Sequence, residues 1–232
     1  MPKITTTRKE YVIYRPEWED TLSKANSMYG KFMSCWLAVC CIFGKRRNEI
    51  CKLRYSDLWV QDEYLYVRFH VGKKKNKKAL IDRMPYTKKI TLKHYAVPFI
   101  LEYLKEFYTK HNHTGITLEE FKAMYIFPSD RKDSDVIIHT KCKNREGVEE
   151  VREYKYHLEG GYMSGADIYN RVKKVNPKIW CHLGRHTVAT LAAESGAGEY
   201  DISNILDVTP RTASKYVHHG TALTEKWSER TG

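Results

Sequence analysis

The sequence predicts a mainly α-helical α+β fold with one small antiparallel β-sheet. Apolar residues recur at helical spacing along most of the 232 residues, as in helices that bury one face. Strand-like alternation stands out at residues 64–71, where every second side chain is apolar. With 42% apolar residues, the chain is long enough to bury a core and is not disordered. We therefore expect a single domain over residues 1–232, with a polar insertion at about 129–160.

The first elements are predicted to be helices. Residues 21–29, 32–43 and 48–53 follow helical spacing, and Gly44 interrupts the pattern. The apolar run 32–43 has only 12 residues, whereas crossing a bilayer takes about 20, so this run predicts a buried helix. The N-terminus carries no apolar leader segment. These features together predict a cytoplasmic protein that does not enter a membrane.

A hairpin is expected next, and helices make up most of the rest. Residues 64–71 form its first strand, 72–88 a loop, and 89–92 the returning strand. Ser164 or Asp167 provides an N-cap for a later helix. The other helices are predicted at residues 97–108, 118–124, 168–175, 182–195, 201–206 and 211–217.

The insertion at 129–160 differs from the rest of the chain. It is rich in charged residues and poor in large apolar ones. We therefore expect a surface excursion with a second hairpin around residues 136–139 and 151–156.

Positive charge is concentrated in one stretch. The chain carries a net charge of +12, and residues 73–93 contain nine basic residues and one acid, which is +8 from that stretch alone. Such a local excess attracts a polyanion, and nucleic acid phosphates are the commonest inside a cell. An anionic membrane surface is the weaker alternative.

A first candidate for phosphate chemistry lies directly after Gly44. Without a metal ion, the negative charge that grows on a reacting phosphate needs directional donors, and guanidinium groups supply them. Arg46 stands at a helix start, with Glu49 three residues later on the same face, so the carboxylate can hold the guanidinium. An exposed basic turn would show the same short pattern, so this pair alone does not decide.

A second candidate is the segment that begins at His182. His182 and Arg185 are one helical turn apart and can reach one phosphate from the same face, whereas His186 faces elsewhere and packs or supports. Gly184 costs about 1 kcal/mol relative to alanine within a helix, which indicates that the backbone needs room there. No metal site is predicted, because Cys181 and the two histidines lack a fourth ligand at a usual spacing. The six cysteines are expected to be small core side chains.

A third candidate is Tyr216. Any one of the 17 tyrosines is usually a core or interface aromatic. Tyr216 is singled out by its position after the two other segments, in a helix that starts at Thr209 and Pro210.

These three segments, in this order, resemble the catalytic domain of the tyrosine recombinases, the phage-type integrase and Xer/Cre-like family. The family's first box is Gly-x-Arg-x-x-Glu followed by Leu-x-x-x-Asp, its second is His-x-x-Arg-His-Thr, and its third ends in a tyrosine after a Thr/Ser-Pro-Lys/Arg-Thr helix start. The matching residues are Gly44, Arg46, Glu49, Leu53, Asp57, His182, Arg185, His186, Thr187, Ala189, Thr190, Thr209, Pro210, Arg211, Thr212 and Tyr216.

The resemblance implies a reaction and a partner. Tyr216 would attack a phosphodiester of double-stranded DNA to give a 3′-phosphotyrosyl link and a free 5′-hydroxyl. Arg46, Arg185 and His182 would stabilise the transition state, and Lys73 would protonate the leaving oxygen. No metal ion or other cofactor is implied, and family members act as DNA-bound tetramers. The supporting residues are Glu49 and His186.

The lysine assignment stays open, because lysines crowd this loop. Gly72 and Lys73 match the family's Gly-Lys at the hairpin loop, but Lys74, Lys75, Lys88 or Lys89 would also suit the role. The residues expected to grip DNA phosphates are Lys74, Lys75, Lys77, Lys78, Lys88, Lys89 and Arg211.

Two departures from the family stand out. The family usually has His or Trp nine residues before the tyrosine, where this chain has Asp207. An ionised aspartate cannot donate a hydrogen bond to phosphate, so Asp207 either binds an arginine in a supporting role or a nearby side chain such as His218 substitutes. In addition, only 45 residues precede Arg46, so we expect no N-terminal core-binding domain. The chain would then be either a natural minimal recombinase or an excised domain.

The sequence therefore predicts a site-specific recombinase or integrase. Two alternatives stay open. The first is a DNA-binding protein of the same fold that has lost catalysis, which the presence of Asp207 suggests. The second is a type IB topoisomerase-like enzyme with the same chemistry.

Overall fold

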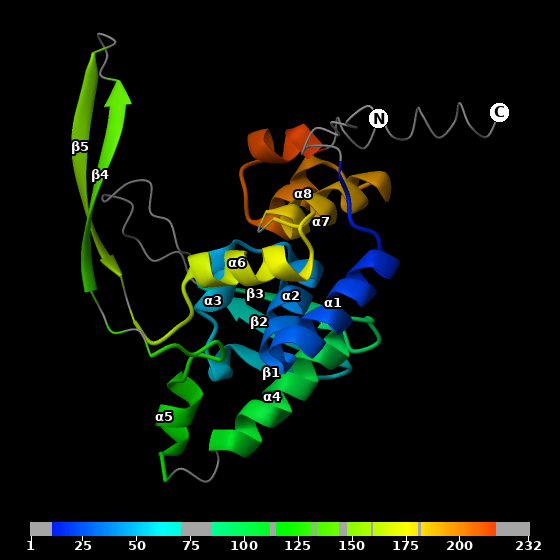
Figure 1. The fold of residues 1–232 in the computed structure, drawn as a ribbon. Helices are drawn as coiled ribbons and strands as arrows, with labels where there is room; N and C mark the ends of the chain where they lie inside the picture. Colours follow the sequence, from blue (N-terminus) through cyan, green and yellow to red (C-terminus); the bar gives the residue numbers. More distant parts are fainter. Residues whose placement is uncertain are drawn as a thin grey trace, which may run out of the picture.

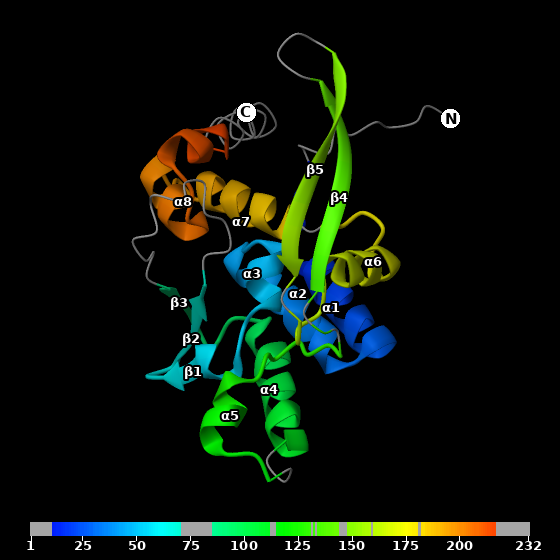
Figure 2. The same ribbon diagram turned by 90° about the vertical axis from the view of Figure 1, so that its left-hand side faces the viewer.

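A computed structural model shows a body of packed helices with a small sheet at one side and a long hairpin projecting from it (Figures 1 and 2). It describes residues 11–70, 85–111, 115–130, 132, 134–143, 148–158, 160–180 and 182–216. The labelled helices are α1 (Arg15–Tyr29), α2 (Lys31–Phe43), α3 (Arg47–Cys51), α4 (Val97–His111), α5 (Leu118–Ala123), α6 (Gly165–Val175), α7 (Leu183–Glu194) and α8 (Glu199–Leu206). A further helical segment covers residues 210–216. The fold is thus mainly α with a small antiparallel sheet, as predicted.

Helix α2 forms the centre of the core. Ten of its 13 residues are buried, since the helix is apolar on nearly every side and has no face suited to water. It packs against α1, α4 and α7. Four cysteines, Cys35, Cys40, Cys41 and Cys51, are buried thiols that form no disulfide, which confirms the core role predicted for them.

The sheet has three antiparallel strands in the order β1 (Leu58–Gln61), β2 (Tyr64–Phe69) and β3 (Tyr86–Thr91). The alternation in β2 was predicted. Strand β1 was not, because it has four residues of which only the first is buried, too short a pattern to reveal alternation. Strand β3 also begins before residue 89, so Lys88 lies within a strand and not in the loop.

The polar insertion contains the hairpin that the sequence predicts. Strands β4 (Ser134–Lys143) and β5 (Glu149–Leu158) pair antiparallel over their whole length. They extend beyond the predicted ranges, because backbone pairing continues past the apolar residues that signal a strand. The ribbon projects away from the helical body (Figure 2).

Helix starts follow local capping chemistry. Ser164 caps α6, its hydroxyl accepting a hydrogen bond from the Asp167 backbone N–H at 3.1 Å, so of the two candidates Ser164 is the cap. Helix α1 begins earlier than predicted, with Pro16 in its first turn, a position that proline favours. In the described part of the chain, no helix combines the length and the apolarity needed to cross a bilayer.

Candidate active site

The two arginine segments meet where α2 ends and α7 begins. A Cβ on Gly184 would lie 2.6 Å from Cys40 Sγ and 2.8 Å from the Cys40 carbonyl oxygen. Gly44 ends α2 in the left-handed region at φ +57°, and a Cβ there would lie 3.0 Å from Arg185 Cα. Both glycines therefore permit a close approach of the two backbones, which accounts for the room that Gly184 was expected to need. This approach brings Arg46 next to Arg185.

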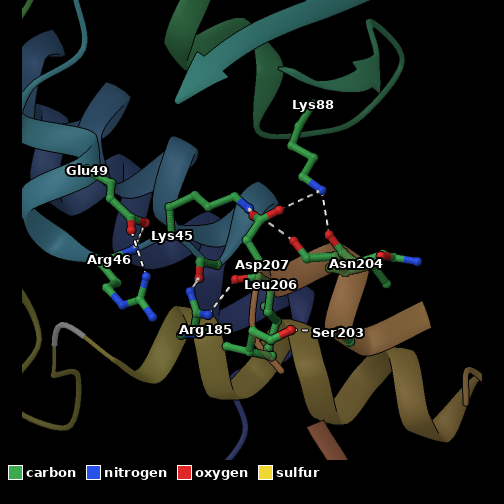
Figure 3. Close-up of polar contacts among 12 residues, drawn as sticks. Lys45, Arg46, Glu49, Lys88, Arg185, Ser203, Asn204, Leu206 and Asp207 are labelled. Carbon is green, nitrogen blue, oxygen red and sulfur yellow. Dashed lines mark hydrogen bonds and ion pairs between the residues drawn. The ribbon is translucent and has the colours of Figure 1, made fainter. Parts of the chain in front are cut away.

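Arg46 is held by Glu49, as the spacing predicts. The Arg46 side chain donates from Nη1 to Glu49 Oε1 at 2.8 Å, and the Arg46 backbone N–H donates to Glu49 Oε2 at 2.9 Å (Figure 3). Glu49 is buried and Arg46 is partly exposed. The buried carboxylate thus fixes a guanidinium that still reaches the surface.

Arg185 is buried and bonded to backbone carbonyls on two sides. It donates from Nη1 to the Gly44 carbonyl at 3.2 Å and from Nη2 to the Leu206 carbonyl. Burial lowers the pKa of Arg185, and the nearby positive charge of Arg46 lowers it further. Two guanidinium groups held this close form a place where an anion such as phosphate is favoured.

The two histidines of the second segment lie in different surroundings. His182 is exposed at the N-cap of α7, and partial burial followed by the charges of Arg185 and Arg46 lowers its pKa. Its neutral form is therefore favoured. The His186 ring lies 5.8 Å from the Tyr216 ring, centroid to centroid, at an angle of 45°. His182 thus belongs with the arginines, whereas His186 packs beside the tyrosine.

Tyr216 is the last residue that the structure describes. Its ring is partly buried and packs on a small apolar cluster that includes Ala189, Ile202 and Leu206. Its electrostatic interaction with Arg185 offsets a small part of the lowering of that arginine's pKa. The third segment is therefore brought to the first two. Arg211, in the same helix, is exposed.

Within the described residues, Asp207 pairs with two lysines and not with an arginine, which corrects the first of the two alternatives expected from the sequence. It ends α8 in the left-handed region at φ +53°, and its carboxylate accepts from Lys45 Nζ and lies 3.2 Å from Lys88 Nζ (Figure 3). Arg185 bonds instead to the carbonyl of the preceding residue, Leu206. Asp207 therefore does not stand as an unpaired negative charge.

Lys45 is the residue that sequence reasoning missed. Its side chain is 0% exposed, and its ammonium also donates to the Ile205 carbonyl at 3.1 Å and lies 4.7 Å from the centroid of the Tyr86 ring. Its pKa is lowered to about 8, because burial lowers the pKa by more than the ion pair with Asp207 raises it. The available signal was Asp207 itself, since a carboxylate at a position that usually holds a donor calls for a compensating cation.

The predicted lysines divide into three groups. Lys88 and Lys89 are adjacent in β3, so their side chains point to opposite faces of the sheet: Lys88 meets Asp207, whereas Lys89 lies 4.5 Å from the centroid of the Tyr64 ring. Among the candidate donors that the structure describes, only Lys88 is brought to this cluster. The remaining predicted lysines lie outside the described residues: Lys73, Lys74, Lys75, Lys77 and Lys78. His218 also lies outside them.

Asp57, from the first box, contacts His70 at the end of the segment that precedes the lysine loop. It is buried, accepts from the Arg54 backbone N–H at 2.9 Å, and its Oδ1 lies 2.9 Å from His70 Nε2. His70 is the last described residue before the loop and was not anticipated, because a histidine on the polar side of a strand gives no signal of a buried partner. Within the described ranges, no group of three or more His, Cys, Asp or Glu side chains is arranged to hold a metal ion.

Comparison with known proteins finds likeness in structure and none in sequence. No protein-family model matches, and no curated protein matches. XerH site-specific recombinase bound to difH substrate, in a pre-cleavage complex, is 16% identical with a TM-score of 0.55, covering 89% of this chain and 50% of that chain. XerA recombinase is 17% identical with a TM-score of 0.58, covering 96% and 65% respectively. The post-cleavage complex of XerH with palindromic difH is 15% identical with a TM-score of 0.59, covering 94% and 52%.

The chain therefore has the fold of a tyrosine recombinase catalytic domain, and its structural neighbours are site-specific recombinases. The resemblance carried by the three boxes is confirmed at the level of the fold. The chain spans between 50% and 65% of the length of the recombinases it matches.

Proposed function

We propose that this chain is the catalytic domain of a site-specific DNA recombinase or integrase that cleaves and rejoins strands through a 3′-phosphotyrosyl intermediate. One observation carries the proposal. Arg185 donates to the carbonyl of Gly44, two residues before Arg46, at 3.2 Å, and the Tyr216 ring lies 5.8 Å from the ring of His186, the residue after Arg185. A phosphate bound by the two guanidinium groups would thus lie near a phenol.

Each residue has a distinct part in the proposed reaction. Tyr216 Oη gives up its proton to water and attacks phosphorus as the phenolate, and the P–O5′ bond breaks. The oxygen that leaves takes a proton from a lysine of the β2–β3 loop, with Lys73 as the first candidate. Arg46 and Arg185 stabilise the charge on the non-bridging oxygens, and neutral His182 donates a hydrogen bond to them. Attack by a 5′-hydroxyl on the phosphotyrosine reverses these steps. Because the link conserves the energy of the broken bond, rejoining needs no nucleotide.

The proposed partner is double-stranded DNA inside the cell. The lysine-rich stretch at 73–93 carries the charge that phosphate binding needs, and two of the matched recombinase structures are complexes with their difH substrates. We further propose that residues 1–232 act as one domain and that four copies assemble on DNA during strand exchange.

The contacts of Asp207 weaken the argument for a protein that binds DNA without cleaving it. That alternative rests on Asp207 repelling phosphate, yet its carboxylate is paired with Lys45 and Lys88. A topoisomerase-like enzyme would share the chemistry, so fold does not separate it from a recombinase. The separating property is dependence on a defined DNA site.

The test is covalent trapping on DNA. The protein is incubated with radiolabelled nicked suicide duplexes tiled across the DNA that flanks its own coding sequence, and the products are separated on a denaturing gel. We expect a slow, protease-sensitive band with the wild-type protein. Tyr216→Phe should lose the band and keep salt-sensitive DNA retention on a filter, because it removes only the nucleophilic oxygen.

Three results would redirect the proposal. A band that persists in Tyr216→Phe shows that another residue is the nucleophile. Filter retention without a band on any tile supports the binding-only alternative. Relaxation of any supercoiled plasmid, without preference for a tile, supports the topoisomerase-like enzyme.

A further inference from the structure

The last carbonyls of α8 receive three cations from three different parts of the fold. Lys88 of β3 donates to the Asn204 carbonyl, Lys45 to the Ile205 carbonyl at 3.1 Å, and Arg185 of α7 to the Leu206 carbonyl (Figure 3). The final carbonyls of a helix have no partner within the helix and carry its partial negative charge. Three cations at this one end therefore fix its position against the sheet and against α7.

Asp207 joins two of these cations to each other. Its carboxylate is 25% exposed and lies between Lys45, which is 0% exposed, and Lys88, which is 26% exposed. A buried lysine charge is costly unless it is paired. Lys45 therefore depends on Asp207, and Lys88 is drawn to the same carboxylate. We refer to Lys45, Lys88 and Asp207 as the Asp207 clamp.

The clamp lies directly before the helix that carries Tyr216. Thr209 is two residues after Asp207, and its carbonyl accepts from the backbone N–H groups of Thr212 at 2.8 Å and Ala213 at 3.1 Å. Val208, the one residue between them, is also held, because its carbonyl accepts from the Ser203 hydroxyl at 2.7 Å. Fixing the end of α8 thus fixes the start of the tyrosine helix.

We propose that Lys45 and Asp207 are positioning residues that set the Tyr216 helix against Arg185 and so govern the rate of phosphotyrosine formation. This inference rests on the proposed function. Asp207 takes the place of the hydrogen-bond donor usual in the family, and in this chain it acts on protein cations and not on phosphate. Lys45 is the residue that makes an aspartate acceptable there.

The experiment is a double-variant cycle in the full chain. Asp207→Asn, Lys45→Met and the combined variant are compared with the wild type for the single-turnover rate of adduct formation, at saturating protein on the suicide duplex. Filter binding and thermal unfolding are measured in parallel. Lys122→Met is the matched control, because Lys122 forms an exposed ion pair with Glu119 at 3.1 Å in α5, far from α8 (Figure 1).

Either single variant should slow adduct formation by about tenfold or more, which is 1.4 kcal/mol or more in the barrier. DNA affinity should change by less than about threefold, since neither residue is proposed to touch DNA. The combined variant should be no slower than the singles and should melt higher than Asp207→Asn, because it does not leave Lys45 buried without its partner. Asp207→Glu should restore part of the rate, and Lys122→Met should match the wild type.

A purely structural pair would lower the melting temperature and leave the rate of the folded, DNA-saturated variants unchanged. That result overturns the inference, as do rate effects that multiply in the combined variant. If Asp207→Asn does not fold, the combined variant still decides, because it lacks both charges. If the wild-type protein forms no adduct, the proposed function itself is contradicted. If Asp207→Asn forms the adduct at the wild-type rate, only the positioning role of the Asp207 clamp is contradicted.

Discussion

The two faces of the three-stranded sheet carry cations in opposite settings. On the inner face, Lys88 bonds to Asp207 and to the Asn204 carbonyl. On the outer face, Lys89 lies 4.5 Å from the Tyr64 ring centroid, and Arg68 lies 5.3 Å from that of Trp59. Lys88 also lies 5.5 Å from the Tyr86 ring centroid, so the difference between the faces is the acceptors. The inner cation bonds to acceptors from a distant part of the chain, whereas the outer cations lie on aromatic rings of the same sheet.

The difference shows that a cation's role depends on its acceptor and not on its place in a charged stretch. Trp59 and Tyr66 stack at 5.3 Å between centroids, with 7° between their planes, and both are register partners in the sheet. Such a surface leaves cationic nitrogens open to solvent, where they are available to phosphate. A cation that donates to carbonyls and carboxylates of the protein, as Lys88 does, instead has its nitrogen engaged within the fold.

The largest contrast is expected between two arginines. Arg185→Leu would leave the Gly44 and Leu206 carbonyls without their donor, and unfilled buried acceptors cost about 1–3 kcal/mol each. We expect a loss of about 2–4 kcal/mol in the free energy of unfolding, measured by urea denaturation. Arg68→Leu, on the outer face, should lose about 0.5–1 kcal/mol. Equal losses would mean that the inner and outer settings do not differ in energy.

A smaller contrast is expected between the neighbours Lys88 and Lys89. Lys88→Met loses a partly buried ion pair and should destabilise the fold by about 1 kcal/mol, whereas Lys89→Met should stay within about 0.5 kcal/mol. Thermal unfolding at low salt checks both. For DNA binding the order should reverse: Lys89→Met should reduce the slope of log affinity against log salt by about 1. Two variants that match in both assays would remove the distinction between the faces.

The smallest effect is expected from His182. Its pKa is lowered in the folded protein, so the unfolded chain binds a proton more readily, and stability falls as the pH drops through the ordinary histidine range near 6.5. Above that range the contribution is fully present. His182→Gln should flatten this part of the stability profile between about pH 7.5 and 5. The change should be small because the side chain is exposed, and an unaltered profile would contradict the assignment.

Local features of the fold could be predicted from the sequence. Helical spacing indicated α2, α4 and α7, and alternation indicated β2, because these periods record which side of an element faces the core. Strand β1 escaped, since its four residues are too few to show a period. The Arg46 and Glu49 pair was also predictable, because residues three apart on a helix are neighbours whatever the rest of the chain does.

The sequence by itself determined the α+β class, the three boxes and the surplus of positive charge. Only the tertiary structure decided that Lys45 is buried, that Asp207 pairs with lysines, and that Lys88 and Lys89 serve different faces. Lys45 and Asp207 are 162 positions apart, so no local period links them. Periodicity reports contacts along one element, whereas ion pairs and burial arise only when separate elements pack together.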